Sequence, residues 1–169
     1  SLRQVLPEST AYPLHEPYFA GNEKKYVDDC IDTGWVSSVG AYVDRFERDL
    51  EKFTGAKHAI VTSNGTSALH VAYRLVGIEA GDEVLLPALT FVATAAPITY
   101  CGAIPHFVDS EEITLGVCPV KLHKYLGEIV EMRDDVCYNK TTGRPIRALV
   151  VVHIFGHPCQ LNEIKAVCD

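Results

Sequence analysis

From residue 58 onward, short apolar runs alternate with segments of helical periodicity. The runs read HAIVT, DEVLLPA, IPHFVD and RALVVVHIFG, and the segments between the first four are TSALHVAYRLVG, FVATAAPITYCG and CPVKLHKYLGEI. Such alternation is typical of right-handed βαβ units around a mostly parallel sheet. VLL and ALVVV show no polar alternation, as expected of strands covered on both faces. The sequence therefore predicts an α/β fold with flanking helices.

The remaining segments are assigned by their caps, prolines and glycines. Residues 1–20 contain three prolines and predict an extended arm, followed by a domain over residues 21–169. GNEKKYVDDCIDTG and VDRFERDLEKFTG predict helices that stop at glycine, and LNEIKAVCD predicts the beginning of another. WVSSVGAY between the first two helices predicts a loop, and TTGRP predicts an exposed hairpin or loop tip.

Charge and composition exclude some classes of function. The chain has 15 basic and 22 acidic residues, so a basic face for nucleic acid is not expected. It contains no run of eighteen apolar residues and no apolar stretch typical of a secretory signal near its start. The six cysteines form no C-x-x-C pair. We therefore expect reduced, mostly buried thiols and a cytoplasmic protein without membrane contact.

The stretch SNGTSALHVA has the features of a phosphate-binding turn between a strand and a helix. Gly65 lets backbone approach a ligand closely, and the amides of Thr66, Ser67 and Ala68 would be unpaired in the first helical turn. The Thr66 and Ser67 hydroxyls add two donors. The alternative is a plain capped helix start with Asn64 or Thr66 as N-cap. The stretch matches neither the Walker loop nor G-x-G-x-x-G, which disfavours nucleotide triphosphates and dinucleotides.

Together with SNGTSAL, the segment GDEVLLPALTFVATAAPITYCGAIPHFVD resembles the sugar-nucleotide aminotransferases of the DegT/StrS type. The resemblance begins at FAGNEKKYVDDCIDTGWVSSVG and extends through RALVVVHIFGHPCQLNEI, so it covers nearly the whole chain. GWVSSVG and TGRPIRALVVVHIFGHP are most similar to the branch that makes 4-amino-4,6-dideoxy sugar nucleotides of the bacillosamine and legionaminic acid type. The resemblance implies the N-terminal, incomplete portion of a fold-type-I large domain that uses pyridoxal 5'-phosphate.

The resemblance also implies roles for single residues. Cofactor-binding residues would hold the phosphate or flank the ring, and a loop would lie near the sugar nucleotide. The residues implied to bind the cofactor are Gly65, Thr66, Ser67, Phe91 and His153. The residues implied for the loop near the sugar nucleotide are Trp35, Ser37 and Ser38. From the residues alone, Phe91 could equally be a core side chain, and Trp35 could equally pin a surface loop.

Two further polar positions have simpler explanations than catalysis. His153 and His157 are spaced like helical zinc ligands, but Gly156 and Pro158 break any helix there, which favours a structural or cofactor-proximal histidine. Asp109 ends a predicted strand and is expected to cap or pair at a loop.

No catalytic residue is assigned. The resemblance places the Schiff-base lysine and the aspartate that holds the pyridinium proton beyond the last strand of this sequence. The eight lysines all lie in charged segments that are expected to be exposed: Lys24, Lys25, Lys52, Lys57, Lys121, Lys124, Lys140 and Lys165. We therefore expect a fragment without activity of its own.

The resemblance implies that the complete enzyme is a homodimer that transfers an amino group from glutamate to a nucleotide-linked 4-keto-6-deoxy sugar. One alternative is a non-catalytic remnant that binds a phosphate ligand or a partner subunit. Another is the variant in which histidine replaces the lysine and the enzyme dehydrates its substrate. The coding sequence downstream of Asp169 discriminates the enzyme from the remnant.

Overall fold

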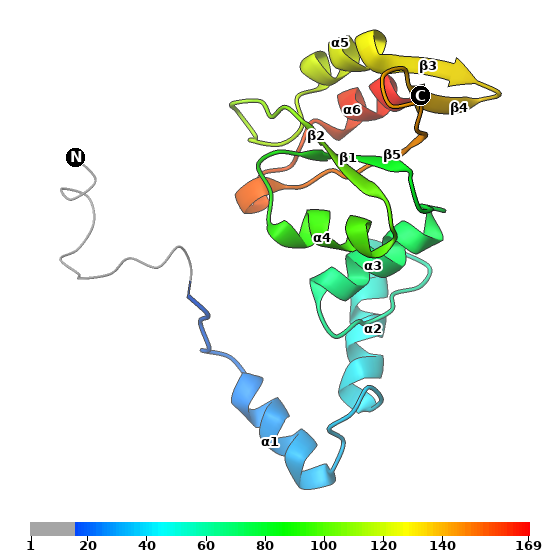
Figure 1. Ribbon diagram of the computed structural model, residues 1–169. Coiled ribbons are helices and arrows are strands. Elements are labelled where there is room, and N and C mark those ends of the chain that lie inside the picture. Colours follow the sequence, from blue (N-terminus) through cyan, green and yellow to red (C-terminus); the bar gives the residue numbers. More distant parts are fainter. Residues whose placement is uncertain (1–15) are drawn as a thin grey trace, which may run out of the picture. The chain divides into compact units, whose positions relative to one another are not determined.

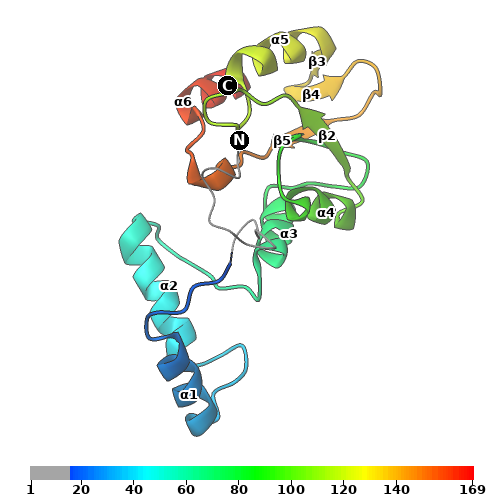
Figure 2. The same ribbon diagram turned by 90° about the vertical axis from the view of Figure 1, so that its left-hand side faces the viewer.

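The computed structural model describes residues 16–169 and divides into two compact units, one up to Ala59 and one from Ile60 onward. Figure 1 and Figure 2 show the chain from two sides.

The first unit contains two helices, α1 (Glu23–Thr33) and α2 (Ala41–Thr54), at the predicted places. Each ends at a glycine in the left-handed conformation, Gly34 and Gly55, both with φ 75°. A residue without Cβ adopts this conformation freely, so the glycines end the helices where the sequence predicted. Of the predicted arm, residues 16–20 have no regular structure, and residues 1–15 lie outside the described residues.

The second unit is built on a parallel sheet, which confirms the predicted fold class. The strands lie in the order β2 (Ile104–Val108), β1 (Glu83–Pro87) and β5 (Ile146–Leu149). The helices of this unit are α3 (Gly65–Leu75), α4 (Val92–Tyr100), α5 (Pro119–Ile129) and α6 (Leu161–Cys168). In Figure 1, α3 and α4 lie on one side of the sheet and α5 and α6 on the other.

All five residues of β1 are buried, which explains why DEVLLPA lacks polar alternation. Successive side chains point to opposite faces of a sheet. Val84 and Leu86 therefore pack into a cluster with Tyr73 of α3 and Ile98 of α4. Leu85 packs into a second cluster with residues of α5 and α6. Helices cover the central strand on both faces, as the sequence predicted.

A hydrogen bond ties α3 to α4. The Tyr73 hydroxyl donates to the carbonyl oxygen of Thr94 at 2.9 Å, and burial raises the pKa of Tyr73 to about 12. Replacing Tyr73 by phenylalanine keeps the packing but removes this hydrogen bond between the two helices. We expect the free energy of unfolding to fall by about 1–2 kcal/mol, measured by urea denaturation. Thr99→Val, which alters an exposed hydroxyl, is the control and should change stability much less.

Three predictions about strands were wrong or incomplete. HAIVT forms no strand, and Ile60 is 84% exposed, because none of the described strands pairs with it. The run RALVVV is a strand only as far as Leu149. The sequence also missed an antiparallel hairpin of β3 (Val130–Arg133) and β4 (Val136–Asn139). The segment TTGRP lies between β4 and β5, and its first four residues are exposed, as predicted for this segment.

Burial also differs from expectation at several side chains. Leu75 and Val76 are apolar residues at helical spacing from Leu69 and Ala72, a pattern that predicts an inward-facing stripe. They are 81% and 60% exposed, whereas the buried residue of α3 is Tyr73. All six cysteines are free thiols, but only Cys101 and Cys159 are buried, so the expectation of mostly buried thiols was wrong. Within residues 16–169, no helix has the length and apolar character needed to cross a membrane.

Candidate functional site

The predicted phosphate loop, Gly65, Thr66 and Ser67, begins helix α3. Asn64 is the N-cap, and its Oδ1 accepts the backbone N–H of Ser67 at 2.9 Å. The backbone N–H of Ala68 donates to the Asn64 carbonyl at 3.1 Å. The prediction that the Ser67 and Ala68 amides are unpaired was therefore wrong, because Asn64 caps the helix as the alternative interpretation proposed.

The loop nevertheless has the features that an anion needs. The backbone amides of Gly65 and Thr66 have no hydrogen-bond partner within residues 16–169. A Cβ added at Gly65 would meet no heavy atom within 4 Å, so the space above this Cα is open. The first turn of α3 carries no acidic residue. The residues present thus fit a phosphate group, which the helix dipole would stabilise by about 0.3–1 kcal/mol.

Phe91 and His153 follow two neighbouring parallel strands, at the same edge of the sheet. Phe91 is the residue before α4, four positions after the end of β1, and its side chain is 75% exposed. His153 comes four positions after the end of β5 and is also exposed. Ligands of open α/β sheets bind outside the carboxyl ends of the strands. In Figure 1, α3 and α4 both run from left to right, so their amino-terminal ends lie on the same side of the second unit.

Within residues 16–169, no hydrogen bond or ring contact joins the phosphate loop to Phe91 or His153. The structure therefore places these residues on one side of the sheet without direct contact between them.

His153 has a definite hydrogen bond. Its Nδ1 accepts the backbone N–H of Cys159 at 3.1 Å, so in the neutral ring Nε2 carries the proton and is a donor. Among the described residues, no group of three or more His, Cys, Asp or Glu side chains is placed to hold a metal ion. His153 and His157 do not lie on one face of an α-helix, because Ile154–Gly156 between them forms a short 3-10 turn.

The predicted substrate loop lies between α1 and α2, in the first unit. Trp35 is 57% exposed, and Ser37 and Ser38 are exposed as well. A Cβ added at Gly40 would lie 3.5 Å from the Cβ of Trp35, so the tryptophan packs over this glycine. One part of the Trp35 side chain thus packs over Gly40, and the exposed part is accessible to a ligand.

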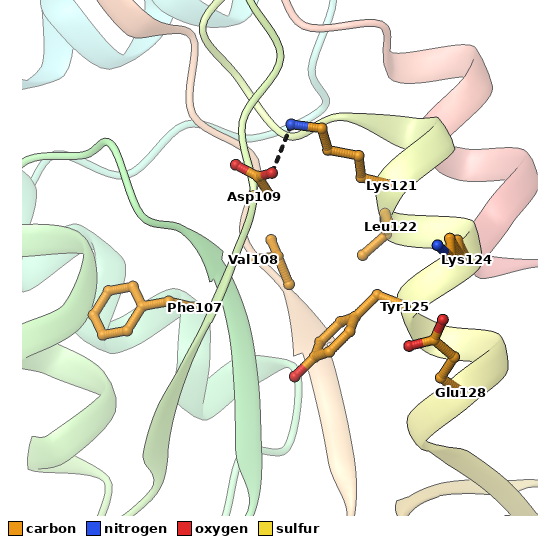
Figure 3. Close-up of a pocket in the computed structure, with 8 residues that line it drawn as sticks. All are labelled: Phe107, Val108, Asp109, Lys121, Leu122, Lys124, Tyr125 and Glu128. Carbon is orange, nitrogen blue, oxygen red and sulfur yellow. Dashed lines mark hydrogen bonds and ion pairs between the residues drawn. The ribbon is translucent and has the colours of Figure 1, made fainter.

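Asp109 pairs with Lys121, as expected of a residue at the end of a strand. The Lys121 ammonium donates to Oδ2 of Asp109 at 2.6 Å, and this hydrogen bond holds the pKa of the carboxyl below its usual value. The pair borders a cavity of about 420 Å³ between the end of β2 and α5, to which Phe107 and Tyr125 also contribute (Figure 3). The cavity contains none of the predicted site residues. All eight lysines are exposed, which confirms that prediction.

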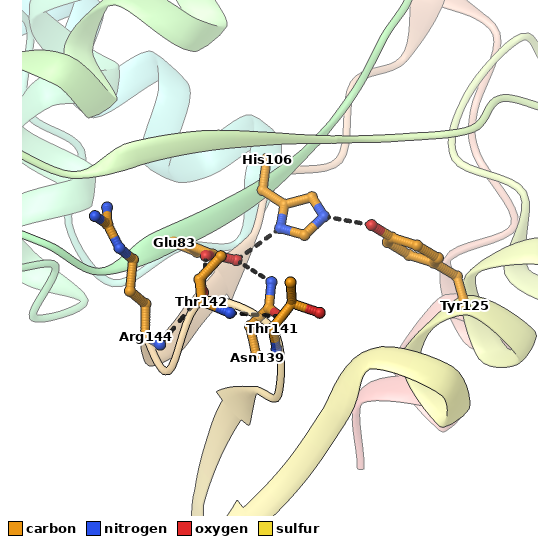
Figure 4. Close-up of polar contacts among 7 residues, drawn as sticks. All are labelled: Glu83, His106, Tyr125, Asn139, Thr141, Thr142 and Arg144. Atoms are coloured by element: carbon orange, nitrogen blue, oxygen red, sulfur yellow. Dashed lines mark hydrogen bonds and ion pairs between the residues drawn. The ribbon is translucent and has the colours of Figure 1, made fainter.

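A buried polar network was not predicted. Glu83 is 3% exposed, and three side chains contact its carboxylate: Nδ1 of His106 at 2.7 Å, Nδ2 of Asn139 at 2.9 Å and Oγ1 of Thr142 at 2.5 Å (Figure 4). Nε2 of His106 lies 2.7 Å from the Tyr125 hydroxyl. Burial alone would raise the pKa of Glu83, but the hydrogen bonds from Thr142, Asn139 and His106 outweigh it and lower the pKa.

The network is structural, because Glu83 is the first residue of β1 and lies at the opposite end of the strand from Phe91. It joins β1, β2, β4, α5 and the loop around Thr142. The only signal in the sequence was the presence of Glu83 and His106 within runs that otherwise predict buried strands. Their partners Asn139 and Thr142 are 56 and 59 positions away along the chain from Glu83.

Comparison with proteins of known sequence finds a group of sugar-modifying enzymes. The chain is 41% identical to GDP-perosamine synthase of Vibrio cholerae over 157 residues, covering 93% of this chain and 38% of that protein. It is 37% identical to GDP-perosamine synthase of Escherichia coli O157:H7 over 152 residues, covering 90% of this chain and 37% of that protein. The chain thus spans less than half the length of these relatives.

Solved structures show the same similarity. The aminotransferase from Psychrobacter cryohalolentis superposes with a TM-score of 0.71 at 29% identity, covering 90% of this chain and 35% of that one. A DegT DnrJ EryC1 StrS aminotransferase from Brucella abortus gives a TM-score of 0.72 at 27% identity, covering 86% and 36%. Together they confirm the predicted aminotransferase fold.

The family model for this group matches residues 17–169, from the end of the predicted arm through the phosphate loop, Phe91 and His153. Aminotransferases of this family use pyridoxal phosphate, as predicted. The chain belongs to the DegT/DnrJ/EryC1/StrS aminotransferase family.

Proposed function

We propose that the protein containing this chain is a pyridoxal phosphate-dependent aminotransferase. It transfers an amino group from glutamate to a nucleotide-linked 4-keto-6-deoxy sugar. The phosphate loop carries this proposal. Gly65 leaves open space, two amides lack partners, and the helix behind them has no acidic residue in its first turn. Unpaired backbone amides at the start of a helix bind anions.

The residues of this chain would bind and orient the cofactor. The Gly65 and Thr66 amides and the Thr66 and Ser67 hydroxyls would hold its phosphate. Phe91 would present an apolar face to its ring, and the Nε2 proton of His153 would be available for a hydrogen bond beside it. Pyridoxal phosphate, when bound, supplies an electron sink for the carbon that loses or gains the amino group. No residue of this sequence is assigned to the proton transfer itself.

The names of the relatives support the substrate assignment. GDP-perosamine synthases carry a GDP-linked amino sugar in their name, which supports a nucleotide-linked sugar as substrate. We place Trp35, Ser37 and Ser38 near this substrate and expect a homodimer in the cytoplasm. The comparison with the Escherichia coli GDP-4-keto-6-deoxy-D-mannose-3-dehydratase, at 23% identity, concerns the fold alone.

The proposal is tested on the full-length protein. Added pyridoxal phosphate should bind and develop a visible absorbance band. Borohydride reduction should remove this band and leave the cofactor attached to a lysine through a stable carbon–nitrogen single bond. With glutamate and a nucleotide-linked 4-keto sugar, the protein should form 2-oxoglutarate and the amino sugar in equal amounts. Binding without amino transfer would favour a non-catalytic protein, and sugar deoxygenation would favour a dehydratase.

A further inference from the structure

The short turn after β5 places an aromatic side chain in an unfavourable backbone conformation. Phe155 has φ 51° and ψ 25°, the left-handed region that residues with a Cβ adopt reluctantly. Within residues 16–169 its side chain is 73% exposed, so core packing against the described residues does not compensate for the conformation. Strained residues of this kind concentrate at ligand sites, where surrounding structure holds them in place.

The surroundings of Phe155 are indeed fixed on both sides. Ile154 is 8% exposed and Cys159 is 6% exposed, and both are anchored in the protein interior. The Gly156 amide donates to the His153 carbonyl at 3.1 Å, and the Cys159 amide donates to Nδ1 of His153. The turn therefore holds the Phe155 ring outward instead of letting it collapse onto the sheet.

The other non-glycine residues with positive φ have local explanations. Asp134 and Asp135, with φ 48° and 61°, form the two-residue turn of the β3–β4 hairpin, which requires this conformation. Leu115, with φ 62°, lies in the loop closed by the bridge between Ser110 and Val117 and is partly buried. Among the described residues, Phe155 alone combines positive φ with an exposed aromatic ring at the carboxyl edge of the sheet.

We propose that Phe155 is a specificity-determining residue that contacts the sugar of the nucleotide-linked substrate through the face of its ring. This inference rests on the proposed function. Phe155 is two residues from His153, which we place beside the cofactor, and the reacting part of the substrate is the sugar that must meet the cofactor there. An aromatic face complements the C–H face of a sugar ring and the methyl group of a 6-deoxy sugar.

The test uses three variants of the full-length protein loaded with pyridoxal phosphate: Phe155→Gly, Phe155→Ala and Phe155→Tyr. Phe155→Gly removes the ring and the backbone strain together. It should keep or raise the melting temperature while weakening substrate binding by about tenfold to a hundredfold, measured by calorimetric titration and as KM. Phe155→Ala should weaken binding equally, and Phe155→Tyr should retain it. The KM for glutamate should not change.

Asp135→Gly is the matched control, because it relieves the same kind of strain in the hairpin turn. It should raise the melting temperature and leave substrate binding unchanged. If Phe155→Gly lowers the melting temperature and leaves substrate binding unchanged, Phe155 is a packing residue and the inference fails. Wild-type protein that neither binds the cofactor nor transfers an amino group would instead overturn the proposed function.

Discussion

Replacing Ser67 by aspartate is expected to weaken pyridoxal phosphate binding by the full-length protein strongly. The new carboxylate would stand in the first turn of α3, beside the Gly65 and Thr66 amides that we assign to the cofactor phosphate. Two like charges about 4 Å apart repel by roughly 4 kcal/mol near a protein surface, which weakens binding by about two to three orders of magnitude. Titration of the cofactor followed by absorbance measures the effect.

The same substitution should not damage the helix. A negative charge in the first turn interacts favourably with the helix dipole, and Asn64 still caps the backbone. We therefore expect the cofactor-free variant to melt at or above the temperature of the cofactor-free wild type. Ser67→Ala serves as the uncharged control and should weaken binding about tenfold or less. Unchanged cofactor affinity in Ser67→Asp would contradict the assignment of the phosphate loop.

Replacing Glu83 by alanine is expected to cost about 3–5 kcal/mol of folding free energy. The substitution removes the shared acceptor of His106, Asn139 and Thr142 and leaves a cavity at the start of the central strand. Each unsatisfied donor adds about 1 kcal/mol or more when it is buried. Urea denaturation of the purified protein measures the loss. Glu131→Ala is the control, because Glu131 forms an exposed pair with Arg133 and should cost about 1 kcal/mol or less.

Glu83 should also make stability depend on pH. Its pKa in the folded protein lies below the ordinary value of 4.5, so its contribution is fully present above that value. The contribution is lost as pH falls through the folded pKa, because both states then bind the proton. The difference in unfolding free energy between wild type and Glu83→Gln should therefore shrink below about pH 4.5. A difference that stays constant down to pH 2 would show that folding does not lower the pKa of Glu83.

The helices were predictable because their signals are local. Gly34 and Gly55 end α1 and α2 at the expected positions, and Pro119 begins α5. Apolar periodicity and the preferences of glycine and proline act within a few residues, so they are readable in any chain. For the same reason the Asn64 cap could be proposed from its place before the first helical turn, as an alternative to an open phosphate loop.

The strands were less predictable, because a strand needs a partner. HAIVT has the composition of a buried strand, yet it pairs with none of the described strands and leaves Ile60 exposed. The β3–β4 hairpin was missed because its turn is Asp134–Asp135 and lacks the glycine that usually marks a two-residue hairpin.

The sequence by itself determined the α/β class, the parallel sheet, the family and a helix that begins at the phosphate loop. Each of these depends on short patterns or on several motifs in combination. Only the tertiary structure decided which amides of the phosphate loop are unpaired, since that depends on where the Asn64 side chain points. It alone revealed the Glu83 network and the outward ring of Phe155. A hydrogen bond between residues 59 positions apart and a strained dihedral angle both arise from folding of the whole unit, and neither has a local signature in the sequence.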